Sequence, residues 1–156
     1  MHELAHLITV VALLSSGALF GAALYDTVVL APNLRGGPQG LEHGRLFMAA
    51  ATPANLFRAL SPATQVLTLL AVGTNWASPS CRWPLVVALI ALVASDIITF
   101  KYHYPRNRLL FSAPLSVAPE ELAAAARQWA SGNLVRVALV LLAWLGTLTA
   151  LLRSAA

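Results

Sequence analysis

Four long apolar segments constrain the fold of this chain more than any other feature. They run near residues 4–30, 53–73, 84–104 and 133–152, and each has about the 20 residues that a helix needs to cross the hydrocarbon core of a bilayer. Only 10% of the residues are charged and 58% are hydrophobic, with a mean hydropathy of +0.72, whereas soluble domains are about 25% charged. The sequence therefore predicts an all-α integral membrane protein, a single domain over 1–156 that folds as an antiparallel four-helix bundle.

The charge and the cysteine content exclude several kinds of function. The formal net charge is +4, and its cations are dispersed at the ends of the spans, so we expect no continuous basic surface for nucleic acid. Cys81 is the single cysteine. This excludes an intrachain disulfide and the thiol exchange of small quinone-coupled membrane oxidoreductases.

The N-terminal residues contain a formal zinc motif. Residues 2–6 are His-Glu-Leu-Ala-His, and HExxH on a helix can place two imidazoles on one face for zinc. A zinc hydrolase also needs a third ligand downstream, and none is evident on that side of the membrane. We therefore expect His2, Glu3 and His6 to hold no catalytic zinc. The apolar run that follows lacks a basic start and is too long for a signal peptide, so we expect a retained first span.

A polar stripe ends the third apolar segment. At 3.6 residues per turn, Asp96, Phe100, His103 and Asn107 share one helical face. Pro105 has no backbone N–H and disfavours the helical conformation of the residue before it, so we expect the helix to stop or kink there. The stripe predicts that this face lines a pocket rather than contacting lipid.

Two other segments carry similar stripes. In the fourth, Trp129, Asn133 and Arg136 are spaced four and then three residues apart, which places them on one face. In the second, polar or helix-bending residues recur at the same spacings, namely Asn55, Arg58, Pro62 and Gln65. If the spans alternate in direction, these stripes meet at one end of the bundle, and we predict one shared pocket there.

Charged groups in such a pocket are expected to be paired. A buried charge costs about 2.5–3.5 kcal/mol on insertion scales, so Asp26 or Asp96 should face Arg58 or Arg136. The alternative is that these pairs only fix the register of the helices.

The cations are divided unevenly between the two ends of the predicted bundle. The end with the long loops holds Arg35, Arg45, Arg58, Lys101, Arg106, Arg108, Arg127 and Arg136, and the other end holds Arg82 and Arg153. The positive-inside rule then predicts cytoplasmic long loops and termini outside the cytoplasm. We expect the protein in the bacterial inner, or cytoplasmic, membrane.

Three motifs together resemble a known family. They are a glycine-rich first span that ends in Tyr25 with Pro32 beyond it, the helix end His103-Tyr104-Pro105-Arg106-Asn107, and Trp129-x-x-x-Asn133-x-x-Arg136. The combination resembles the anthrone oxygenase-like family of small four-helix membrane proteins, which includes enzymes that oxidise anthrones to anthraquinones. The resemblance covers nearly the whole chain.

The resemblance implies a membrane-embedded oxygenase or oxidase that acts on an apolar, anthrone-like aromatic molecule. Removing a proton from the carbon opposite the anthrone carbonyl gives an electron-rich anion that reacts with dioxygen. Such chemistry needs a base, a cation for the developing oxyanion and aromatic walls. His103 suits the first role, Arg136 or Arg58 the second, and Tyr25, Phe100, Tyr104 and Trp129 the third. Further candidates are Asn133 and Asp96 in catalysis, and Asn55 and Asn107 in substrate binding.

Cofactors and partners remain open at this level. The chain has no nucleotide or flavin fingerprint, so we expect no organic cofactor, or else a metal held by His43, His103 and a carboxylate. Expected partners are the aromatic substrate and membrane lipids. The alternative function is a non-catalytic membrane protein that binds a lipid or quinone-like ligand, forms a homo-oligomer or serves as an accessory subunit. A transporter is disfavoured, because the polar residues gather at one end.

Overall fold

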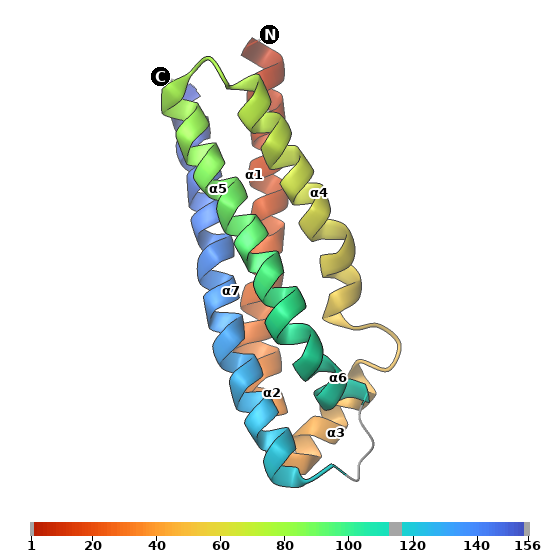
Figure 1. Ribbon diagram of the computed structural model, residues 1–156. Coiled ribbons are helices and arrows are strands. Elements are labelled where there is room, and N and C mark those ends of the chain that lie inside the picture. Colours follow the sequence, from red (N-terminus) through yellow and green to blue (C-terminus); the bar gives the residue numbers. More distant parts are fainter. Residues whose placement is uncertain (1, 113–116, 155–156) are drawn as a thin grey trace.

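The computed structural model describes residues 2–112 and 117–154, and no β-strand occurs among them. Figure 1 shows the helical elements in chain order. They are α1 (His2–Tyr25), the π-helical turn η1 (Asp26–Leu30), α2 (Ala31–Leu34), α3 (Gly37–Phe47), α4 (Pro53–Thr74), α5 (Pro79–Ile98), the π-helical turn η2 (Thr99–His103), α6 (Tyr104–Ser112) and α7 (Pro119–Ser154).

Four helical runs are long and apolar enough to cross a membrane, which confirms the predicted all-α membrane fold. They are His2–Leu34, Pro53–Thr74, Pro79–Ser112 and Pro119–Ser154. The runs alternate in direction, so α1 and α5 descend in Figure 1 while α4 and α7 ascend. Each of α1 and α5 packs against both α4 and α7. Both ends of the chain lie at one end of the bundle, and α2, α3 and α6 lie at the other.

The helices extend beyond the segments that hydropathy marks. The last one begins at Pro119 rather than near residue 133, and its 36 residues make a rod of about 54 Å at 1.5 Å per residue. That length exceeds a hydrocarbon core of about 30 Å, so α7 projects well past the membrane. The segment between the first two spans, where glycine and proline predict a long loop with room for a short interfacial helix around Leu46, contains the 11-residue helix α3. Arg45 of α3 donates from Nε to the carbonyl of Leu110 at 2.6 Å, which ties α3 to α6.

Two prolines lie two residues after a π-helical turn. Ala31 donates its N–H to Asp26 and Tyr104 donates to Thr99, each across five residues instead of four, and Pro32 and Pro105 follow directly. A proline cannot donate and its ring crowds the carbonyl four residues earlier, so a wider turn gives the ring room. The helix was expected to stop or kink at Pro105. It does not stop there, because the helical run continues to Ser112, but the π-helical turn η2 interrupts the regular α-helix directly before Tyr104.

The end of the bundle that holds the termini is closely packed by small residues. Ala12, Ala71, Cys81, Leu85 and Ala150 belong to one buried cluster. A Cβ atom added at Gly146 of α7 would lie 2.7 Å from the carbonyl oxygen of Pro84 and 3.2 Å from the Cβ atom of Ala88. The missing side chain thus lets α5 and α7 approach closely, as small residues do between membrane helices.

Candidate active-site cavity

A cavity of about 760 Å³ lies near the end of the bundle opposite the termini. The first turns of α4 form one wall, α5, η2 and α6 form another, and η1 and α7 close the back. In Figure 1, α4 diverges from the other spans toward this end. The volume falls within the range of about 300–1,000 Å³ that small-molecule sites occupy.

A buried ion pair forms the back of the cavity. Arg136 donates from Nη2 to Oδ2 of Asp26 at 2.6 Å, and the two residues are 6% and 2% exposed. The Cζ atom of Arg136 also lies 4.4 Å from the centroid of the Phe57 ring, within range of a cation–π contact. This pair is one of those that the cost of a buried charge predicts, and it confirms that Arg136 faces Asp26.

A second carboxylate is held at the α4–α5 interface. Asp96 accepts hydrogen bonds from Ser61 Oγ at 2.8 Å on Oδ1 and from Gln65 Nε2 at 2.6 Å on Oδ2. Both donors are neutral and come from α4. Asp96 therefore lines the cavity without an arginine partner within salt-bridge distance among the described residues, whereas Asp26 is neutralised by Arg136.

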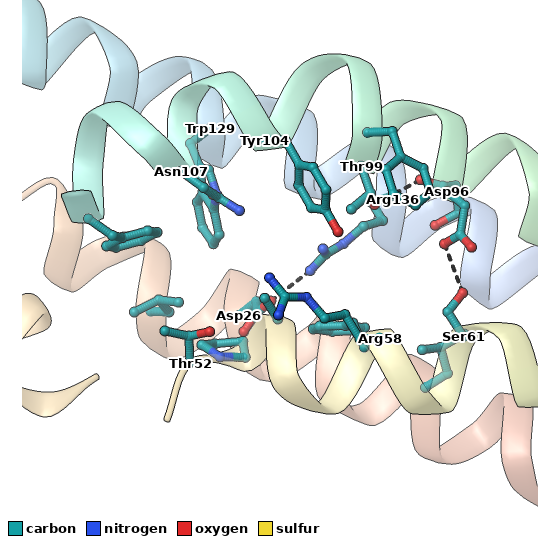
Figure 2. A pocket seen from close by; sticks show the side chains of 18 of the residues that line it. Asp26, Thr52, Arg58, Ser61, Asp96, Thr99, Tyr104, Asn107, Trp129 and Arg136 are labelled. Carbon is teal, nitrogen blue, oxygen red and sulfur yellow. Dashed lines mark hydrogen bonds and ion pairs between the residues drawn. The ribbon is translucent and has the colours of Figure 1, made fainter. Parts of the chain in front are cut away.

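Two polar side chains project into the cavity from opposite walls. Figure 2 shows the guanidinium of Arg58 directed inward from α4, and the hydroxyl of Tyr104 directed inward from the start of α6 toward Arg136. Phe100 contacts Tyr104 edge to face, with ring centroids 5.1 Å apart. Donors and flat apolar surface therefore occur together, as in sites for polar aromatic ligands.

An amide and an indole fix the far wall. Trp129 donates from Nε1 to Oδ1 of Asn107 at 2.7 Å, so the Nδ2 atom of Asn107 is left to face the cavity (Figure 2). Behind this wall, His103 meets Trp129 edge to face with centroids 5.6 Å apart. A Cβ atom at Gly132 would collide with the ring of Tyr102, so only glycine lets η2 pack this closely on α7.

Seven of the predicted site residues line the cavity. Four are polar and three are aromatic: Arg58, Asp96, Asn107, Arg136, Phe100, Tyr104 and Trp129. Their roles stay predictions, because position alone does not establish catalysis. Residues that were not among the candidates also line it, and they include Thr52, Phe57, Ser61 and Thr99. Ser61 and Phe57 each lie one residue from Pro62 or Arg58 of the predicted polar stripe on α4. Their part in the cavity is evident only from their contacts with Asp96 and Arg136.

The expected placement of His103 and Asn133 in the same cavity as Arg136 was wrong. His103 is 1% exposed and packed behind Trp129, and Asn133 turns toward the first span, donating to Thr27 Oγ1 at 2.6 Å. The π-turn η2 explains the first error. It inserts one extra residue per turn, so Tyr104 rather than His103 follows Asp96 and Phe100 along the cavity face.

Three other candidates lie away from the cavity. Tyr25 is 48% exposed on the outer surface, because the next residue along the helix, Asp26, takes the inward position. Asn55 is exposed near the start of α4, where its Oδ1 accepts from Thr52 Oγ1 at 3.1 Å. His43 is exposed on α3, and His103 is buried elsewhere, so the weakly favoured metal pair does not form.

Metal-binding side chains are not grouped in the described parts of the chain. Within residues 2–112 and 117–154, no three His, Cys, Asp or Glu side chains gather where they could hold one ion. His2, Glu3 and His6 are exposed on the first turns of α1, and His6 Nδ1 lies 3.5 Å from Ser154 Oγ.

The fold and the cavity define a four-span membrane protein with a chamber for a small molecule between its helices. Residues 52–146, more than half of the chain, match the family model described as anthrone oxygenase. The chain belongs to the anthrone oxygenase family, which confirms the resemblance in its motifs. Searches of curated proteins and of solved structures found no match.

Proposed function

We propose that the protein oxidises an apolar, anthrone-like aromatic molecule inside the cavity, using dioxygen. Family membership supports the class of reaction. The observation that carries the proposal for this chain is the cavity itself, which aromatic side chains, a carboxylate without an ion pair and a fixed guanidinium line together. A substrate dissolved in the bilayer would reach this space between the spans.

The proposed reaction converts a ring methylene to a ketone. Loss of one C–H proton gives an anion whose negative charge lies mainly on the oxygen of the existing carbonyl. The anion passes electrons to O2, and a C–O bond forms at the former methylene carbon. The resulting hydroperoxide loses the second C–H proton and its outer oxygen as water. One oxygen atom ends in the quinone and the other in water, so atoms and electrons balance.

Asp96 is the proposed proton acceptor. Its carboxylate lines the cavity, and its hydrogen-bond donors among the described residues are the neutral Ser61 and Gln65, so it is not committed to an ion pair as Asp26 is. A positioned base contributes about 10²–10⁴-fold to a rate. His103, the base that sequence reasoning favoured, is packed behind Trp129 and acts instead as support for that wall.

Arg136 and Tyr104 are the proposed donors to the developing oxyanion. Arg136 is fixed by Asp26 and Phe57 before any substrate binds, and donors fixed in advance stabilise developing charge without reorganisation. The Tyr104 hydroxyl is directed toward the Arg136 guanidinium (Figure 2). Phe57, Phe100 and Trp129 supply flat walls for the rings.

The orientation in the membrane is part of the proposal. The cavity lies at the cation-rich end, so the positive-inside rule places it near the cytoplasmic face of the bacterial inner membrane, with both termini outside. Reporter fusions after residue 156 should be active only outside the cytoplasm. Activity confined to the cytoplasm would reverse the orientation and leave the cavity assignment unchanged.

The test uses purified protein in lipid nanodiscs with a synthetic anthrone, following quinone absorbance and oxygen uptake above the uncatalysed rate. We expect one O2 consumed for each quinone formed. Asp96→Asn should lower turnover by about 100-fold or more, while Ser61→Ala, which removes one bond to the same carboxylate, should lower it far less. Because the proposed steps use only protein groups and O2, turnover should survive treatment with a chelator.

Two outcomes would contradict the proposal. One is a wild-type rate no higher than that of empty nanodiscs, and the other is full activity in a folded Asp96→Asn variant. Tight binding of the quinone without any turnover would favour a non-catalytic aromatic-binding protein.

A further inference from the structure

The charges that line the cavity are unequal in number. Three arginines and two aspartates line it, namely Arg58, Arg108, Arg136, Asp26 and Asp96. Asp26 is paired with Arg136, and the oxygens of Asp96 are taken by Ser61 and Gln65. Among the described residues, Arg58 and Arg108 form no salt bridge, so the lining, with three arginines and two aspartates, carries a net charge of +1.

These two cations come from opposite walls. Arg58 lies on α4 and its guanidinium is directed into the cavity (Figure 2), while Arg108 lies on α6. Within residues 2–112 and 117–154, neither side chain donates a hydrogen bond that would hold it against its own helix, in contrast to Arg35, which donates from Nε to the carbonyl of Ala31 at 3.3 Å. Both residues are exposed, so their guanidinium groups are accessible to a ligand, and an anion in the cavity would gain charge-assisted hydrogen bonds from them.

We propose that Arg58 and Arg108 bind an anionic oxygen substituent on the aromatic substrate, a carboxylate or an ionised phenol. The aromatic character of the ligand rests on the function proposed above, whereas the anionic group rests on the net positive charge of the lining and on two arginines that form no salt bridge with the described residues. Guanidinium groups recognise such oxygens through paired, charge-assisted hydrogen bonds. The anion would hold one edge of the rings at Arg58 and Arg108 and leave the reacting carbon free to meet Asp96.

The test compares two ligands of the same shape, anthraquinone-2-carboxylate and anthraquinone-2-carboxamide, by calorimetry with protein in phosphatidylcholine nanodiscs. We expect the carboxylate to bind at least about tenfold more tightly, which corresponds to about 1.4 kcal/mol. Arg58→Gln and Arg108→Gln should each reduce this preference, and the double variant should abolish it. Arg58→Lys, which keeps the charge, should retain part of it.

Arg127→Gln is the matched control. Arg127 is an exposed arginine on α7 at the same end of the bundle, outside the lining of the large cavity, so its loss lowers the net charge equally. The preference for the carboxylate should persist in this variant. A preference that falls as far in Arg127→Gln as in Arg58→Gln would reduce the effect to general attraction by the basic end and overturn the proposal.

Two further results would also overturn it. Equal affinities for the two ligands in the wild type would show that the cavity does not select an anion. Loss of the preference when half of the lipid is phosphatidylglycerol would assign the two arginines to lipid phosphate instead. The binding assay needs no turnover, so it tests this proposal separately from the reaction. An anion preference without oxidation would contradict the proposed oxygenase reaction. Oxidation without an anion preference would contradict only the assignment of Arg58 and Arg108.

Discussion

The two ends of the bundle use the same four spans in opposite ways. At the end with the termini, Gly146 lets α7 pack directly on the backbone of α5 at Pro84, and the interior contains an apolar cluster in which small residues predominate. At the other end α4 diverges, two π-turns interrupt the regular helices, and a buried ion pair lies behind a cavity of about 760 Å³. The end with the termini is therefore closely packed, whereas the other end contains a cavity and the candidate site.

The largest effect is expected from the ion pair at the cavity end. Asp26→Asn leaves the Arg136 guanidinium buried without a counterion, and breaking such a pair costs about 3–5 kcal/mol of stability. The double variant Asp26→Asn with Arg136→Met should recover most of that loss and remain inactive. Unfolding by SDS in mixed micelles measures both. A single variant that loses less than about 1 kcal/mol, as exposed pairs do, would show that the pair is not buried in the membrane.

A smaller loss is expected at the terminal end. Gly146→Val forces a side chain against Pro84 and Ala88, and overpacking costs about 1–3 kcal/mol. Turnover per folded molecule should stay unchanged, because the contact lies far along α7 from the cavity. Gly21→Val is the control, since a Cβ at Gly21 meets nothing within 4 Å. If Gly146→Val lowers turnover while leaving stability unchanged, the claim that this end serves stability and the other end serves the site is wrong.

The smallest effect concerns the far wall of the cavity. Trp129→Phe removes the hydrogen bond to Asn107, a contribution of about 0.5–1.5 kcal/mol. We expect KM to rise several-fold with little change in kcat, because the wall positions the rings and does not touch the reacting carbon. Trp76→Phe, a change at an exposed indole at the terminal end, should alter neither constant. A drop in kcat alone would give Trp129 a direct part in the chemistry.

Much of this architecture follows from the sequence. Hydropathy identifies the four spans, and the cost of a buried guanidinium predicts that Arg136 meets an aspartate. Seven of the candidate residues line the cavity. Arg58, Asp96, Trp129 and Arg136 lie in the regular helices α4, α5 and α7, where spacing of 3.6 residues per turn predicts which residues share a face. Alternation of the spans then brings these faces to one end.

The error at His103 arises where the helix departs from regular spacing, whereas Asn55 and Asn133 lie in regular α-helices and face away from the cavity because of packing. The π-turn η2 rotates His103 away from the cavity and brings Tyr104 into its lining. A prediction that assumes 3.6 residues per turn along the whole helix does not contain this extra residue. The signal was Pro105, which predicted a break but not its form. Tyr25 and Asp26 are adjacent, so hydropathy could not decide which one faces inward. The contacts of α4 with α5 through Ser61 depend on packing that no local pattern specifies.

The most direct measurement is to locate a flat aromatic ligand in the bundle. A diazirine-bearing anthraquinone, photolysed on protein in nanodiscs and mapped by mass spectrometry, should label the segments 52–62 and 99–111, which line the cavity. Excess unlabelled anthraquinone should prevent the labelling. Labelling confined to the terminal end, around residues 81–88 and 143–150, or labelling that excess ligand does not displace, would contradict the assignment of this cavity as the active site.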